Sequence, residues 1–144
     1  MATNKESVRR LIGEGYIQGN VDVIDELCTE DYVNHEALSG DLDKDGEKEF
    51  IRDLHEGMSG LHVEILDLFG EGDLVGYRWR ATGTHTGMFM GFQPTGNSIE
   101  INGTDVAHCE GGRFRELWSN YDTLGFLRQV GAGTGVSPES RPSA

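Results

Sequence analysis

The stretch at residues 112–122, GRFRELWSNYD, combines a strand-like alternation with an acidic side chain at its end. The positions that share one parity are Phe114, Trp118, Asn120 and Asp122. Side chains of one parity project from the same face of a strand, so Asp122 points into the interior if Phe114 and Trp118 face a core. A carboxylate held in apolar surroundings has a raised pKa, which suits a general acid or base near neutral pH.

A second role for Asp122 follows from the residues after it. Residues 123–130, TLGFLRQV, predict a helix, and Asp is a favoured N-cap residue. His108 lies in the preceding predicted strand, residues 98–109. Ile99 and Ile101 share one parity there and Val106 and His108 the other, so Gly103 suggests a bulge that re-aims the strand. Asp122 is therefore a candidate acid/base residue with the N-cap as its alternative, and His108 is the second titratable side chain of interest in these two strands.

The remaining pattern predicts the elements that must position this pair. Apolar residues at helical spacing predict a helix that Thr3 or Asn4 caps and Gly19 ends, a short helix at residues 21–27, and a third at residues 46–58. From residue 61 onward the period changes to two, with a hairpin turn at residues 70–73. Helices followed by long antiparallel strands indicate an α+β fold, in which the three N-terminal helices pack on the concave face of a curled sheet that encloses a pocket.

Residues 83–96 interrupt the strands with glycines and a proline, yet they carry Met88, Phe89, Met90 and Phe92. Loops seldom hold so many large apolar side chains unless they cover something. The loop is a lid over a ligand, or it is buried against a partner subunit or against the domain's own helices.

An acidic loop at residues 39–46 matches the first half of a calcium-binding loop through Asp41, Asp43, Asp45 and Gly46. The position that needs a bidentate Glu is Arg52, and no helix leads directly into the loop. We interpret this segment as a solvated acidic loop without a metal.

Composition narrows the class of protein. With 144 residues the chain is long enough for one domain, expected at residues 1–131, followed by a flexible Gly/Ser/Pro-rich tail at residues 132–144. Twelve basic and 25 acidic residues give a net charge of −13, which argues against nucleic acid and anionic membranes as partners. Proteins of salt-loving organisms have a similar balance, although an ordinary acidic bacterial protein can have it too.

The cysteines and the apolar segments of the chain indicate the cellular compartment and the kinds of metal site that are excluded. Cys28 and Cys109 are too few for a disulfide framework or a clustered zinc site, and we interpret both as small buried hydrophobes. The N-terminus lacks the basic and apolar regions of a signal peptide, and no apolar run is long enough to span a membrane. The expected location is cytoplasmic.

Three motifs together carry a family resemblance. They are residues 31–35 (DYVNH), residues 83–89 (GTHTGMF) with residues 94–96 (PTG), and residues 112–122. With these motifs the chain resembles the SnoaL-like polyketide cyclases, a family of the nuclear transport factor 2-like superfamily of cone-shaped α+β folds. The resemblance extends over roughly residues 5–131 and implies a deep apolar pocket closed by helices, no metal, no organic cofactor, and a homodimer.

The resemblance also implies roles for particular residues. Asp122 matches the acid/base position of the cyclases, His108 a pocket histidine, and His35 a histidine near the cavity. The implied substrate is a small apolar molecule such as a polyketide-like ester, and the implied reaction is an intramolecular aldol-type ring closure that needs a base and an enolate-stabilising donor. The candidate substrate-binding residues are His35, Tyr32, Trp79, Phe89, Phe114, Trp118 and Asn120.

A function from another class stays open beside the cyclase or isomerase. The same pocket would serve a non-catalytic or stress-associated protein that binds a small apolar ligand. A metal hydrolase fits less well, because His35, His62, His85 and His108 show no ligand spacing.

Overall fold

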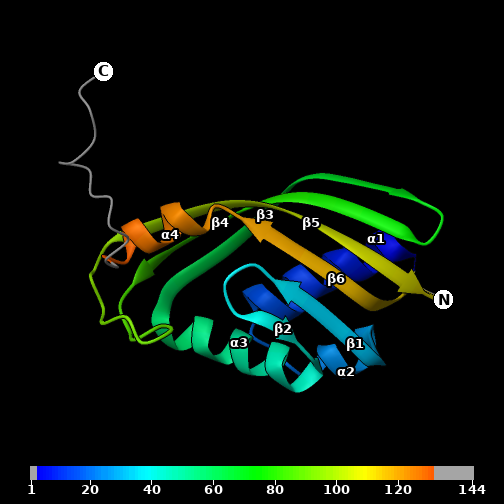
Figure 1. Cartoon of the computed structure of the whole chain (residues 1–144), viewed down its shortest axis with the longest axis horizontal. Coiled ribbons are helices and arrows are strands. Elements are labelled where there is room, and N and C mark those ends of the chain that lie inside the picture. Colours follow the sequence, from blue (N-terminus) through cyan, green and yellow to red (C-terminus); the bar gives the residue numbers. More distant parts are fainter. Residues whose placement is uncertain (1–2, 132–144) are drawn as a thin grey trace.

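A curved sheet of six strands frames the structure, a computed structural model that describes residues 3–131 (Figure 1). Its spatial order is β2 (Gly40–Leu42), β1 (Cys28–Glu36), β6 (Arg113–Tyr121), β5 (Ser98–Glu110), β4 (Leu74–His85) and β3 (Met58–Glu71). All neighbouring strands are antiparallel except β1 and β6, which run parallel. The predicted α+β fold is confirmed. The prediction described the strands as antiparallel and did not include the parallel pairing of β1 with β6.

Helices cover the concave face of this sheet. The helix α1 (Asn4–Arg10) continues into a π-helical segment, η1 (Leu11–Ile17), and α2 (Val23–Leu27) and α3 (Lys44–Gly57) follow. In Figure 1 the sheet arches over η1 and α3, while α4 (Thr123–Gln129) lies at the end where β6 terminates. The three predicted N-terminal helices are thus present as α1 with η1, α2 and α3.

Local sequence signals explain where these helices begin. Thr3 and Glu6 form a capping box, in which each side chain accepts a hydrogen bond from the other residue's backbone N–H at 3.1 Å. Asp43 caps α3 by accepting from the backbone N–H of Gly46 at 2.8 Å. The acidic segment at residues 39–46 therefore contains the short strand β2 and the cap of α3.

The sheet and the helices enclose two apolar clusters. The larger joins α1, η1, α2 and α3 to the sheet and includes Leu11, Ile51, Tyr77 and Phe114. The smaller lies near α4 and consists of Met58, Phe89, Ile99, Ile101, Phe126 and Val130. Residues of both clusters line the cavity described below.

A β-bulge in β6 changes which face its side chains occupy. His108 pairs with Glu116 and Cys109 pairs with Phe114, so Arg115 is an extra residue on β6. Phe114 is fully buried, but Trp118 is 37% exposed on the opposite face. The prediction that these two residues face one interior is therefore wrong, because an inserted residue reverses the parity of everything after it.

The strand β5 contains no bulge at Gly103, contrary to the prediction. Its pairing with β4 runs without interruption from Ser98 to His108. Gly103 has a different role, since a Cβ atom there would lie 2.3 Å from the indole ring of Trp79. The absent side chain leaves room for the Trp79 indole against β5, and the regular alternation puts His108 on the convex face.

The cysteines and the chain ends complete the description. Cys28 and Cys109 are both buried and free, each paired in the sheet with Phe114 on β6, as expected of small buried hydrophobes. Within residues 3–131, no helix is long and apolar enough to cross a membrane. The predicted flexible tail at residues 132–144 lies outside the described residues.

Candidate active site

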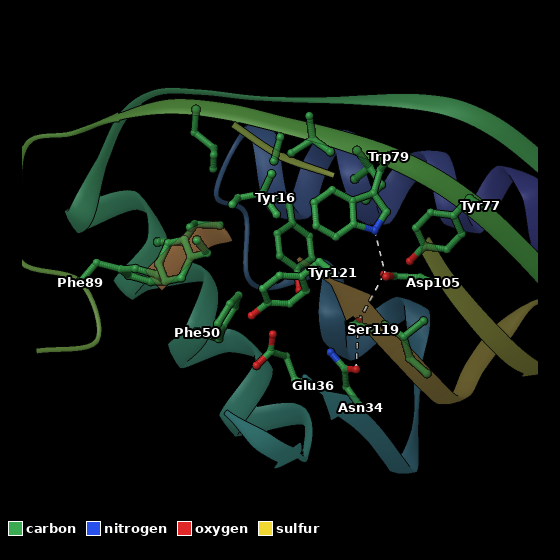
Figure 2. Close-up of a pocket in the computed structure, with 18 residues that line it drawn as sticks. Tyr16, Asn34, Glu36, Phe50, Tyr77, Trp79, Phe89, Asp105, Ser119 and Tyr121 are labelled. Carbon is green, nitrogen blue, oxygen red and sulfur yellow. Dashed lines mark hydrogen bonds between the residues drawn. The ribbon is translucent and has the colours of Figure 1, made fainter. Parts of the chain in front are cut away.

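A cavity of about 120 Å³ lies between the concave face of the sheet and the helices, and 18 residues line it (Figure 2). Its wall is mainly apolar, with aromatic side chains from α3, the β4–β5 loop and α4. Six polar side chains come from the sheet and one, Tyr16, comes from η1. The six are Asn34, Glu36, Tyr77, Asp105, Ser119 and Tyr121.

Four of these polar residues form one row across the sheet. Tyr77 on β4 pairs with Asp105 on β5, and Asp105 pairs with Ser119 on β6. Ser119 in turn pairs with Glu36 on β1. Residues directly opposite one another in neighbouring strands project from the same face, so the row brings two carboxyl groups into one cavity.

Asp105 occupies the centre of this site and is only 7% exposed. Its Oδ1 accepts a hydrogen bond from Trp79 Nε1 at 2.9 Å, and its Oδ2 lies 3.3 Å from the hydroxyl of Ser119. Burial raises the pKa of Asp105 to about 7, and hydrogen bonds from Trp79 and Ser119, together with the nearby hydroxyl of Tyr77, limit that rise. The result is a carboxyl group that can both accept and donate a proton near neutral pH.

A second buried acid supports this arrangement from beneath. Glu47 on α3 accepts hydrogen bonds from the hydroxyl of Tyr16 at 2.6 Å and from Nδ2 of Asn34 at 2.9 Å. This contact orients the amide of Asn34 so that its Oδ1 faces Ser119, at 3.1 Å from the hydroxyl. Burial raises the pKa of Glu47 as well, and the chain of contacts ends at Asp105.

Glu36 is the second carboxyl group of the row and is 5% exposed. Its Oε2 accepts hydrogen bonds from the backbone N–H groups of Leu38, at 3.0 Å, and Ser39. Its Oε1 is buried and has no hydrogen-bond partner among the described residues. Figure 2 shows this carboxylate directed toward the cavity, beside the hydroxyl of Tyr121.

Aromatic rings form the opposite end of the cavity. The ring of Phe89 packs edge-to-face against Phe50 and Phe126, with centroid distances of 6.0 and 5.8 Å. Phe89 belongs to the loop between β4 and β5, whose Thr86 and Gly87 both donate backbone hydrogen bonds to the carbonyl of Gly57. The loop thus attaches to the end of α3 and directs one ring inward, while Met88 and Met90 remain exposed.

The structure distributes the predicted substrate-binding residues over three locations. Trp79 and Phe89 line the cavity. Tyr32 and Phe114 are buried in the larger apolar cluster and do not line it. Their side chains pack against the helices, where tight packing leaves no open space.

His35, Trp118 and Asn120 lie on the convex face, away from the cavity. The imidazole of His35 stacks on the Trp118 ring with centroids 5.5 Å apart. Its Nε2 contacts Glu116 at 2.6 Å and its Nδ1 contacts Asp41 at 2.8 Å. These two carboxylates, Glu116 first, raise the pKa of His35.

The structure does not bring Asp122 and His108 together in one pocket. Asp122 is exposed and caps α4 by accepting from the backbone N–H of Gly125 at 2.9 Å. His108 lies on the convex face, where its Nδ1 is 3.0 Å from the guanidinium of Arg115. Asp122 lies outside the cavity because the bulge in β6 reverses the parity of the residues after it. His108 lies outside because β5 alternates regularly.

Sequence reasoning missed Asp105 and Glu36, although a signal for each exists. On β5 the inward positions are Ile99, Ile101, Gly103, Asp105 and Ala107, so Asp105 is an acid in an otherwise apolar alternation. On β1 the inward positions include Tyr32, Asn34 and Glu36. Asp105 and Glu36 share one signal in the sequence: each is a polar residue at a position whose neighbours two residues away along the strand are buried.

Within residues 3–131, no group of three or more His, Cys, Asp or Glu side chains is placed to hold a metal ion.

Comparisons with known proteins agree with this architecture. The profile of the SnoaL-like polyketide cyclase family matches residues 6–130. A SnoaL-like polyketide cyclase candidate from Jannaschia sp. CCS1 is 26% identical, with a TM-score of 0.80 over 88% of this chain and 90% of that chain. IdmH, a candidate polyketide cyclase from Streptomyces antibioticus, is also 26% identical, with a TM-score of 0.78 over 91% of this chain and 100% of that one.

A third similar structure is a candidate polyketide cyclase from Acidithiobacillus ferrooxidans, 28% identical, with a TM-score of 0.76 over 90% of this chain and 94% of that chain. A search of curated proteins gives no match. Because the family profile matches nearly the whole of the described chain, this protein belongs to the SnoaL-like polyketide cyclase family.

Proposed function

We propose that this protein is an acid/base cyclase or isomerase that closes or rearranges a small apolar ketone or ester, with Asp105 as the proton-transfer group. The observation that carries the proposal is the position of the Asp105 carboxyl, which is buried in the cavity wall, where burial raises its pKa to about 7. Family membership supports the class of reaction. Asp105 takes the role that the sequence had suggested for Asp122.

The chemistry follows from the groups around Asp105. Its ionised form takes a proton from a carbon next to a substrate carbonyl, and the electrons of that C–H bond move onto the carbonyl oxygen as an enolate. The hydroxyl of Tyr77 suits the enolate oxygen, because it is buried without a hydrogen-bond partner and burial raises its pKa, which keeps it a neutral donor.

Ring closure completes the reaction without an external reagent. The enolate carbon attacks a second carbonyl of the same molecule and forms the new C–C bond. The neutral carboxyl of Asp105 returns its proton to the resulting alkoxide, so the product is an isomer of the substrate. The apolar walls hold the two ends close together, which favours closure over release.

The size of the cavity restricts the substrate. An engineered apolar cavity of about 150 Å³ accepts benzene, so a cavity of about 120 Å³ suits a molecule of roughly one ring. A longer polyketide-like ester requires Phe89 and its loop to move outward. Either substrate is small and apolar.

Deuterium exchange tests the proposal without knowledge of the natural substrate. Acetophenone in D₂O takes up deuterium at its methyl group through the same enolate, and NMR follows the rate. The wild-type protein should accelerate this exchange, and the acceleration should rise with pH through about 7 as Asp105 ionises. Asp105→Asn should lower it by roughly a hundredfold or more, because an amide cannot accept the proton.

Asp122→Asn is the matched control, since it makes the same chemical change at the exposed cap of α4. It should retain the exchange activity. Loss of activity in Asp122→Asn with retention in Asp105→Asn would restore the original assignment. Saturable binding of acetophenone without any exchange would instead support the non-catalytic ligand-binding function.

We also propose that the protein forms a homodimer through the convex face of its sheet. A row of side chains crosses that face in register, from Phe69 through Val106 and Trp118 to His35. Phe69, Val106 and Trp118 are 56%, 39% and 37% exposed. Apolar side chains grouped on one face favour contact with a partner, and family resemblance makes a second copy the expected one.

A further inference from the structure

The free oxygen of Glu36 is a polar group that the proposed proton transfer does not use. Glu36 Oε1 is buried without a hydrogen-bond partner among the described residues, while Oε2 receives the backbone N–H groups of Leu38 and Ser39. The backbone contacts hold the carboxylate in place, and Oε1 remains open. A buried acceptor without a partner is rare because its lost hydration is not replaced.

We infer that Glu36 Oε1 binds a hydroxyl group of the substrate and so selects a molecule with a hydrogen-bond donor at that end. The inference rests on the proposed function, since both place the substrate in the same cavity. A carboxylate oxygen accepts hydrogen bonds and cannot donate one when ionised. A carbonyl, an ether or a halogen therefore gains nothing at this position, whereas a phenol or an enol does.

The spacing of the two carboxyl groups defines the substrate further. Glu36 and Asp105 lie on either side of Ser119 in one row, two strand spacings apart. Neighbouring strands are about 4.8 Å apart, so the two backbones are separated by roughly 10 Å. A single ring with a hydroxyl at one end and a carbonyl-activated C–H at the other has about the length needed to reach groups on two strands at this spacing.

Tyr121 is the competing explanation for the open oxygen. Its hydroxyl is directed toward Glu36 in Figure 2, and the pKa of Tyr121 is raised by burial first and then by Glu36, which acts both as a nearby hydrogen-bond acceptor and as a charge. The geometry nevertheless leaves Oε1 without a hydrogen bond. Tyr121 therefore flanks the Glu36 position, and a ligand hydroxyl can lie between the two groups.

A pair of ligands of nearly equal size tests the inference by binding alone. We would compare 4′-hydroxyacetophenone with 4′-fluoroacetophenone by NMR titration at pH 6.5, where the phenol is neutral. The wild-type protein should bind the hydroxyl compound about tenfold more tightly, as expected for a hydrogen bond to a charged acceptor. Glu36→Gln should abolish or reverse this preference, because its carbonyl oxygen takes the backbone contacts and its NH₂ group faces the cavity.

Two further variants separate this inference from the proposed function. Asp105→Asn should lose exchange activity but keep the preference for the hydroxyl compound. Tyr121→Phe should keep that preference as well. Equal affinity of the two ligands for the wild-type protein, or a preference that survives in Glu36→Gln, would overturn the inference while leaving the exchange result intact. A preference that disappears in Asp105→Asn or Tyr121→Phe would assign the hydroxyl to that residue and would equally overturn it.

A structure of the wild-type protein with 4′-hydroxyacetophenone gives a test that does not depend on any variant folding. The hydroxyl oxygen should lie within hydrogen-bond distance of Glu36 Oε1. A ligand bound with the hydroxyl at the aromatic end, among Phe50, Phe89 and Phe126, would contradict the inference.

Discussion

Asp105 is a carboxyl group that folding places where its ionised form is unfavourable. The unfolded chain exposes it to water with a pKa near 3.8, whereas burial in the folded protein raises the pKa to about 7. Between these two values the folded protein binds more protons at this site than the unfolded chain. The free energy of unfolding must therefore fall as pH rises from about 4 to 7.

Asp105→Asn should make the protein more stable above pH 7. The amide carries no charge to desolvate, and its oxygen can still accept from Trp79. A shift of about three pKa units corresponds to roughly 4 kcal/mol, so we expect a gain of about 1 to 3 kcal/mol at pH 8 and almost none at pH 4. Urea unfolding of the wild type and the variant at pH 4 and pH 8 measures this difference in the free energy of unfolding.

Part of the pH dependence should remain in this variant, because burial also raises the pKa of Glu47. Wild-type and Asp105→Asn proteins with parallel profiles from pH 4 to 8 would show that Asp105 is not desolvated. A gain in stability together with a loss of exchange would show that this residue is retained for chemistry at a cost in stability.

At the scale of elements, the contact between Trp79 on β4 and Gly103 on β5 orients the site. A Cβ atom at Gly103 would lie 2.3 Å from the indole and 2.8 Å from the carbonyl oxygen of Asn120. The indole must then move, and its Nε1 hydrogen bond to Asp105 depends on its present position. Gly103 thus leaves the indole of Trp79 in the position from which it donates a hydrogen bond to Asp105. That hydrogen bond favours the ionised form of the Asp105 carboxyl.

Gly103→Ala should destabilise the protein by about 1 to 3 kcal/mol, as expected for an overpacked core. It should also raise the pKa of Asp105 further, since one hydrogen bond to the charged form is lost. Thermal unfolding measures the first effect, and the pH profile of deuterium exchange measures the second.

Gly13→Ala is the control, because a Cβ atom at Gly13 has no neighbour within 4 Å. This variant should leave both the exchange profile and the stability nearly unchanged or slightly improved. A Gly103→Ala protein that behaves like Gly13→Ala would show that Trp79 is free to shift without effect on Asp105.

At the scale of the whole molecule, the two faces of the sheet carry different chemistry. The concave face presents the polar row inside the cavity, and the convex face presents Phe69, Val106 and Trp118 to the outside. A net charge of −13 opposes self-association, so a dimer should be favoured when salt screens the repulsion.

Val106→Asp, at the middle of the convex row, should convert the proposed dimer into a monomer. A carboxylate there would be desolvated in the interface and would face its own copy or a near neighbour across the symmetry axis. Light scattering in molar potassium chloride should show twice the chain mass for the wild type and one chain mass for the variant.

Leu124→Asp is the control, since Leu124 is 43% exposed but lies on α4 and not on the sheet. It should remain a dimer. A wild-type protein that is monomeric at micromolar concentration would reject the dimer, and dissociation by Leu124→Asp alone would place the interface at α4.

Local patterns were sufficient to predict most elements of this fold. Thr3 caps α1, the change from helical to alternating spacing occurs where α3 passes into β3, and an acid before residues 123–130 begins α4. Such features act over a few residues, so they can be read from neighbours in the chain. The motifs that resemble the family predicted, in addition, the curled sheet and its cavity.

Only the tertiary structure decided which side chains face that cavity. One extra residue, Arg115, turns Trp118, Asn120 and Asp122 outward, and nothing in the alternation of residues 112–122 shows where it is inserted. The bulge belongs to the pairing of β6 with β5, and β6 also pairs with β1 on its other side, so both partners lie far away in sequence. The sequence by itself predicted an acid in an α+β pocket. Strand pairing decided that Asp105 and Glu36 line the cavity and that Asp122 does not, because a shift of one residue exchanges the two faces of a strand.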